Sequence, residues 1–193
     1  MQEKLLKIKL YLKNIYDIDV IILDRKVSIS EELLGWKNGK LILKDNFRIP
    51  EGTLFMVCHV FGHLVQFQTY EKYEKLISIV NNKAYLNENI HQYKDKYFLF
   101  EKEAFMIGKS LMKNSIGIDS ELELKYEAFM HADFNIYWNY IVTHELNELM
   151  FKTEYNSKLI LFQNSRKEKF MKIINVVSGI DAKKINHLNI TIK

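Results

Sequence analysis

The sequence contains few residues that break helices, with one proline and seven glycines among 193 residues. So few breakers favour long helices over a turn-rich sandwich or barrel. A single cysteine, Cys58, excludes an internal disulfide. The lysine-bearing stretch from Met1 to Lys13 lacks the continuous apolar region and the cleavage site of a secretion signal. These absences together predict a cytoplasmic protein that is rich in helices.

Long apolar runs and runs of like charge are also missing. No stretch approaches the length of consecutive apolar residues that a membrane-spanning helix needs, so we expect no membrane span. The net charge of +4 is spread along the chain, without a basic stripe that alternates with aromatic residues. Nucleic acid is therefore not indicated as a partner. The chain length suits one domain with a well-buried core.

The spacing of apolar residues predicts the order of secondary-structure elements. A helix is expected over residues 2–15, and short apolar runs at 19–24 and 40–44 are typical of strands. The Asn38-Gly39 pair is typical of a hairpin turn. Further helices are expected at 54–70, 71–82, 98–113, 121–142 and 166–177, with a late strand at 188–192. This order predicts a single α+β domain over 1–193, mostly helical, with a small antiparallel sheet.

Two histidines stand four residues apart in the most apolar of the predicted helices. Residues at this spacing project from one face of a helix, so the rings of His59 and His63 can share one tetrahedral metal ion. Gln66 lies on the same stripe, where it can touch a metal, a water or a substrate. A helix that is apolar on all sides is buried, and burying an imidazole costs free energy unless it is hydrogen-bonded or metal-bound. The alternative is a pair of core histidines bonded to backbone carbonyls.

The segment CHVFGHLVQF, which contains both histidines, resembles the HExxH helix of zincin metallopeptidases. It is most similar to that helix in the ImmA/IrrE family, whose motif also carries the glycine before the second histidine. The later segment FEKEAF resembles the family's E-x-E-A-like stretch, which implies that Glu101 is the third ligand of a zinc ion. The resemblance covers residues 1–113, which include the metal helix and the Glu101 helix. Residues 114–193 are then a helical extension whose role it does not explain.

Two positions depart from the family's pattern. Val60 replaces the glutamate that activates the zinc-bound water, and Phe105 stands where the family tends to place Asn or Asp. Another carboxylate, with Glu103 the nearest in sequence, can supply the base. Residues two apart on a helix point in nearly opposite directions, so only one of Glu101 and Glu103 is expected to face the metal directly. The other possibilities are a metal site without hydrolysis and a fold that has lost its metal.

The function predicted from these features is a divergent zinc metallopeptidase-like protein with an atypical or degraded active site. The resemblance implies a protein or peptide as substrate or partner, with Glu103 and Gln66 as the candidate catalytic residues. The alternative is a non-catalytic binding or regulatory module that reuses a zincin-like fold, so the sequence leaves open whether the protein is an enzyme. A third possibility is a helical structural protein with two core histidines.

A second polar stripe follows the predicted helix at 121–142. Its members fall at steps of four and are most simply a solvated helix face: Glu123, Glu127, His131 and Asn135. Glu127 is the next candidate for third ligand if Glu101 does not take that place. Tyr137 and Tyr140, on the same helix, are candidates to stabilise an oxyanion, but nothing in the sequence selects one of them.

Overall fold

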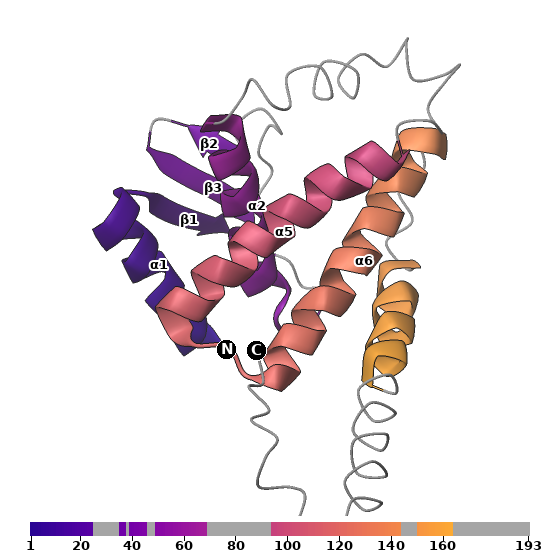
Figure 1. The fold of residues 1–193 in the computed structure, drawn as a ribbon. Coiled ribbons are helices and arrows are strands. Elements are labelled where there is room, and N and C mark those ends of the chain that lie inside the picture. The colour runs from indigo at the N-terminus through magenta and orange to yellow at the C-terminus, as the bar shows by residue number, and fades with distance from the viewer. Residues whose placement is uncertain (25–34, 38, 46–48, 69–93, 144–149, 164–193) are drawn as a thin grey trace, which may run out of the picture.

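The computed structural model describes residues 1–24, 35–37, 39–45, 49–68, 94–143 and 150–163, and its fold is α+β and mostly helical, as predicted. Figure 1 shows α1 and a small sheet on one side, α6 and the helical residues 150–163 on the other, and α2 and α5 between them. The elements are α1 (Gln2–Tyr16), β1 (Asp19–Leu23), β2 (Gly35–Lys37), β3 (Lys40–Lys44), α2 (Gly52–Gln68), α5 (Lys94–Ile116) and α6 (Ser120–Thr143).

The predicted elements can be compared with the structure where it describes them. The helices and strands expected from residue 2 to residue 70 are present, with ends shifted by a few residues, and so are the helices expected at 98–113 and 121–142. The helical residues 150–163 were not predicted. The elements predicted at 71–82, 166–177 and 188–192 lie outside the described residues. Within the described part of the chain, no helix is long and apolar enough to cross a membrane.

The sheet is mixed, whereas an antiparallel sheet was predicted. β2 and β3 form the expected antiparallel pair, and Gly39 adopts a φ of 75° at the turn between them. β1 lies on the other side of β3 and runs parallel to it, with Val20 paired to Leu41. The alternation of apolar and polar residues predicts which face of a strand is buried. It does not predict whether the neighbouring strand runs parallel or antiparallel. The prediction was therefore correct for the hairpin and wrong for β1.

One hydrophobic core joins the sheet to the helices. It takes residues from α1, β1, β3, α2, α5 and α6 and also includes Phe151 and Tyr155 from the helical residues 150–163. Aromatic rings fill its centre, where Phe55 of α2 contacts Tyr126 and Phe129 of α6 at centroid distances of 5.1 and 5.5 Å. The helix that carries both histidines is therefore packed into the core, which favours a preorganised site.

Two glycines let α2 and α5 approach each other closely. A Cβ atom on Gly62 would overlap the backbone carbonyl oxygen of Ala104 and lie 2.8 Å from the Cα of that residue. A Cβ atom on Gly108 would meet the Tyr126 hydroxyl and lie 2.6 Å from the carbonyl oxygen of Cys58. Contacts this short leave no room for a side chain, so glycine is required at both positions. The close crossing brings the histidine face of α2 against the middle of α5.

An ion pair links the start of α2 to α6. The Glu51 side chain is 10% exposed, and its Oε1 accepts a hydrogen bond of 3.0 Å from Lys125 Nζ, which also contacts Glu121 at 2.9 Å. The hydrogen bonds with Glu121 and Glu51 raise the pKa of Lys125, so the ammonium stays charged. The pair therefore compensates the burial of the Glu51 carboxylate.

Removing the cation of this pair is expected to destabilise the fold. Lys125→Met keeps the apolar stem of the side chain but leaves the Glu51 carboxylate buried without its cation. We expect the free energy of unfolding to fall by about 1–3 kcal/mol, measured by urea denaturation. Lys113→Met, at an exposed position of α5, is the matched control and is expected to change the free energy by less than about 0.5 kcal/mol. Equal stability of the two variants would contradict this role for Lys125.

Candidate metal centre

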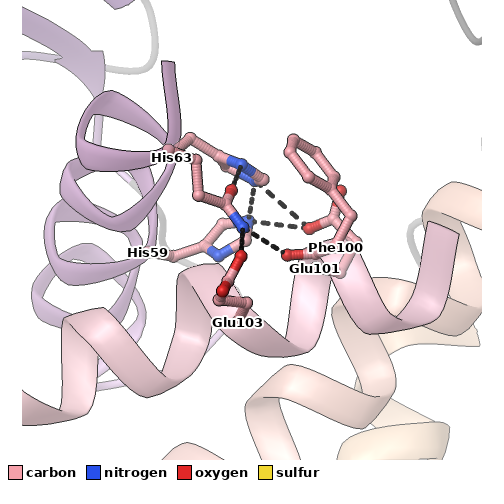
Figure 2. A network of polar contacts seen from close by, with 6 residues as sticks. His59, His63, Phe100, Glu101 and Glu103 are labelled. Atoms are coloured by element: carbon pink, nitrogen blue, oxygen red, sulfur yellow. Dashed lines mark hydrogen bonds and ion pairs between the residues drawn. The ribbon is translucent and has the colours of Figure 1, made fainter. Parts of the chain in front are cut away.

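Three ligand atoms from two helices converge at the crossing of α2 and α5. Figure 2 shows His59 and His63 on one helix facing Glu101 on the other. The Nε2 atoms of the two histidines are 3.1 Å apart, and Glu101 Oε2 lies 3.3 Å from His59 Nε2 and 3.2 Å from His63 Nε2. The three residues form a group that can hold a metal ion. The structure thus brings together the three residues that the sequence suggested as ligands.

The dimensions of this triangle match one face of a tetrahedral zinc site. Ligand atoms bound to a tetrahedral ion at about 2.0–2.1 Å lie about 3.3–3.4 Å apart. The three separations here are 3.1, 3.2 and 3.3 Å, so small outward movements would accommodate an ion. Similar distances also suit hydrogen bonds, which can hold the group together without a metal. The geometry is therefore compatible with a metal-bound site and with a metal-free site.

The site is buried but not sealed. The side chains of His59, Glu101 and His63 are 7%, 10% and 17% exposed, so His63 is the most accessible of the three. The ring of His59 stacks on Phe105, with a centroid distance of 3.9 Å and an interplanar angle of 23°. Burial lowers the effective dielectric constant around the three side chains, and this strengthens their electrostatic attraction for a cation.

The surroundings of the Glu101 side chain favour its carboxylate form. Burial by itself would raise the pKa of Glu101, but hydrogen bonds and charge interactions with His59 and His63 outweigh it and hold the pKa well below its usual range. With two neutral imidazoles, the triad would carry one negative charge, which suits a divalent cation.

Gln66 connects His63 to the second glutamate on α5. Its Oε1 lies 2.9 Å from His63 Nδ1, and its Nε2 donates to the Phe100 carbonyl oxygen at 2.8 Å and to Glu103 Oε2 at 3.1 Å. Gln66 is 2% exposed, so these bonds are made in the protein interior. The structure places both candidate catalytic residues, Gln66 and Glu103, in a hydrogen-bond network that begins at His63 Nδ1. Glu101, in contrast, contacts the Nε2 atoms of both histidines.

The two histidines have different surroundings at their outer nitrogens. His63 Nδ1 contacts Gln66, whereas the buried Nδ1 of His59 has no hydrogen-bond partner among the described residues. Metal-binding histidines usually donate from the outer nitrogen to a carboxylate, a carbonyl or a water. His63 follows this pattern within the described part of the chain, and His59 does not.

Tyr97 is a neighbour of the triad that was not identified as such from the sequence. It precedes Glu101 by four residues on α5, and burial, the charge of Glu101 and a hydrogen bond with that carboxylate raise its pKa far above the usual range. Its hydroxyl therefore stays protonated beside Glu101. The i, i+4 spacing from Glu101 was the signal that would have found it.

The second polar stripe, which was predicted to be a solvated helix face, is partly exposed and also contacts α5 and the helical residues 150–163. Glu123 and Glu127 both contact Lys109 of α5, and the Glu127 contact is 3.3 Å long. The His131 ring lies between Phe98 and Phe162, and Asn135 donates to Glu154 at 3.3 Å. Glu123, Glu127 and Asn135 therefore have polar partners within the protein, and the His131 ring packs against aromatic rings.

Of the two tyrosines that were candidates to stabilise an oxyanion, the structure describes the side chain of Tyr137. Tyr137 is 46% exposed, and its ring stacks on Tyr97 with a centroid distance of 6.0 Å. The side chain of Tyr140 lies outside the described residues.

Cys58 is fully buried, and burial raises the pKa of its thiol far above the usual range, which suits a structural residue.

Comparison with known proteins gives no further assignment. No family model, curated protein or solved structure matches the chain. The function must therefore be argued from the residues of the site.

Proposed function

We propose that this protein is a divergent metallopeptidase-like protein that binds one zinc ion through His59, His63 and Glu101. The observation that carries the proposal is the triangle of ligand atoms, with edges of 3.1, 3.2 and 3.3 Å. Two imidazoles and a carboxylate form a set of ligands that catalytic zinc sites use, and three protein ligands leave a tetrahedral ion one position for water or substrate.

The choice of zinc rests on the chemistry of the ligands. Calcium and magnesium prefer shells of oxygen atoms, whereas imidazole nitrogens suit zinc and other late transition metals. A zinc ion would also explain why two imidazoles lie 3.1 Å apart in a buried place beside one carboxylate.

Metal competition tests the identity of the ion. Metal-free protein is incubated with equal amounts of Zn²⁺, Mn²⁺, Mg²⁺ and Ca²⁺ and then freed of unbound ions. We expect about one equivalent of zinc and almost none of the other three, because two imidazoles favour zinc. Retention of magnesium or calcium in place of zinc would contradict the assignment.

The peptidase-like part of the proposal concerns what the zinc ion does. When bound, zinc polarises a substrate carbonyl and lowers the pKa of its water to about 7. Val60, partly buried, occupies the position from which a zincin glutamate takes a proton. Its apolar side chain favours a second candidate function, a metal-bound module that recognises a protein or peptide without cleaving it.

Installing the missing base separates these two functions. Val60→Glu in zinc-loaded protein is expected to raise hydrolysis of a fluorogenic peptide library by about 100-fold or more, since a positioned general base contributes about 10²–10⁴-fold. Val60→Gln is the matched control, because it has a similar shape but accepts no proton, and we expect it to behave like the wild type. Equal and negligible hydrolysis by both variants, each with zinc bound, would contradict the peptidase-like function and support the non-catalytic module.

A further inference from the structure

The orientation of the Gln66 amide is determined by its neighbours. One end of the amide faces two oxygen atoms, the Phe100 carbonyl at 2.8 Å and Glu103 Oε2 at 3.1 Å. A carbonyl oxygen only accepts hydrogen bonds, so the group that faces it must be the amide NH₂. The reversed amide would bring three acceptor oxygens together without a proton between them. The Oε1 atom therefore faces His63.

This orientation determines the tautomer of His63. Its Nδ1 lies 2.9 Å from Gln66 Oε1, an acceptor, so Nδ1 must carry the proton. In the neutral ring, the lone pair is then on Nε2, which can accept a hydrogen bond from a protonated His59 Nε2 at 3.1 Å. The 3.2 Å contact between His63 Nε2 and Glu101 Oε2 is a hydrogen bond only when the His63 ring is protonated on both nitrogens. The neutral ring with its proton on Nδ1 is the form that binds a metal through Nε2.

We propose that Gln66 is a positioning residue that holds His63 in its metal-binding tautomer, and that Glu103 and the Phe100 carbonyl hold Gln66. The effect on metal affinity rests on the proposed zinc site, whereas the effect on the tautomer does not. His59 has no equivalent partner among the described residues, because its buried Nδ1 is unpaired and its ring stacks on Phe105. Gln66 thus prepares one ligand in advance and leaves the other to adjust when the ion binds.

The tautomer can be read directly in metal-free wild-type protein. Long-range ¹H–¹⁵N correlation spectra distinguish a protonated ring nitrogen from an unprotonated one, and they are read at the alkaline limit of a pH series, where the ring is neutral. We expect His63 to show a single form with the proton on Nδ1. A ring with the proton on Nε2, or one that exchanges between the two forms, would overturn the proposal.

Two variants then test the role of Gln66. Gln66→Met removes the acceptor while keeping much of the volume, and we expect mixed tautomers for His63 and a zinc affinity about 10–100-fold lower. The double variant Gln66→Glu with Glu103→Gln exchanges the carboxylate and the amide. Position 66 then keeps an acceptor for His63, so we expect the single tautomer and most of the zinc affinity to return.

A control and a fold check make the outcome decisive. Asn135→Leu removes another amide–carboxylate hydrogen bond, 3.3 Å long and outside this network, and should change neither the tautomer nor the zinc affinity. Gln66→Met protein that is folded by circular dichroism, yet keeps the wild-type tautomer and affinity, would refute the proposal. If Gln66→Met does not fold, the wild-type spectrum, which shows which ring nitrogen of His63 carries the proton, still tests the proposed tautomer. The expected tautomer in a protein that binds no zinc would support the role of Gln66 and reject the proposed zinc site.

Discussion

Glu101→Gln is expected to lower the zinc affinity by more than about 100-fold. The loss of an outer hydrogen-bond partner of a ligand costs about 10–100-fold, and Glu101 is itself a proposed ligand and the only carboxylate of the triad. The substitution keeps the shape of the side chain but removes the charge that attracts the cation. The affinity is measured by competition with a chromophoric chelator.

Glu103→Gln is the matched control for this experiment. It makes the same chemical change two residues away, at a carboxylate that accepts a hydrogen bond of 3.1 Å from Gln66 and is not one of the three grouped ligands. The new amide oxygen can still accept that bond, so we expect the zinc affinity to stay within about tenfold of the wild type, below the typical loss for an outer partner. Equal losses in the two variants would show that the negative charge of this region binds the cation without a specific ligand.

Gly62→Ala is expected to destabilise the fold and weaken the metal site at the same time. Replacing a glycine with alanine inside a helix usually stabilises the helix by about 1 kcal/mol. Here the added Cβ would overlap the Ala104 carbonyl and lie 2.8 Å from the Cα of that residue, and backbone atoms cannot rotate away as a side chain can. We therefore expect a net loss of about 1–3 kcal/mol in the free energy of unfolding, measured by urea denaturation.

The metal site should respond because the crossing of the helices determines its dimensions. His59 and His63 belong to α2 and Glu101 to α5, so a shift of one helix from the other lengthens two edges of the triangle. Gly108→Ala adds the same methyl group where α5 meets Cys58 and Tyr126, and we expect a similar loss of stability. A Gly62→Ala protein that is more stable than the wild type and binds zinc equally well would contradict the close packing of α2 and α5.

The sequence predicted the part of the site that lies on one helix. The spacing of His59 and His63 was sufficient for that, because residues four apart share a helix face whatever the rest of the fold does. Glu101 came from the resemblance of the segment around it to a family motif, since spacing alone does not say which residue of a distant helix will face the histidines. The structure brings Glu101 to His63 across 38 positions of sequence.

Other features depend on contacts that periodicity does not contain. The parallel pairing of β1 with β3 depends on the path of the chain between strands, and the need for Gly62 depends on how closely α5 approaches. The link from His63 through Gln66 to Glu103 involves both helices, so the stripe on α2 suggested Gln66 without indicating what it would contact. The partial burial of the second polar stripe follows from contacts with Lys109 and with the helical residues 150–163, which were not predicted.

The measurement that tests the zinc site most directly is the metal content of tag-free protein beside that of His63→Ala, determined by mass spectrometry of the elements. We expect about one zinc per wild-type chain and almost none in the variant, because the alanine removes one corner of the ligand triangle. Both proteins should give the circular dichroism of a mostly helical fold. Wild-type protein that is folded, has met no chelator, contains no metal and takes up none when zinc is added would contradict the proposed site.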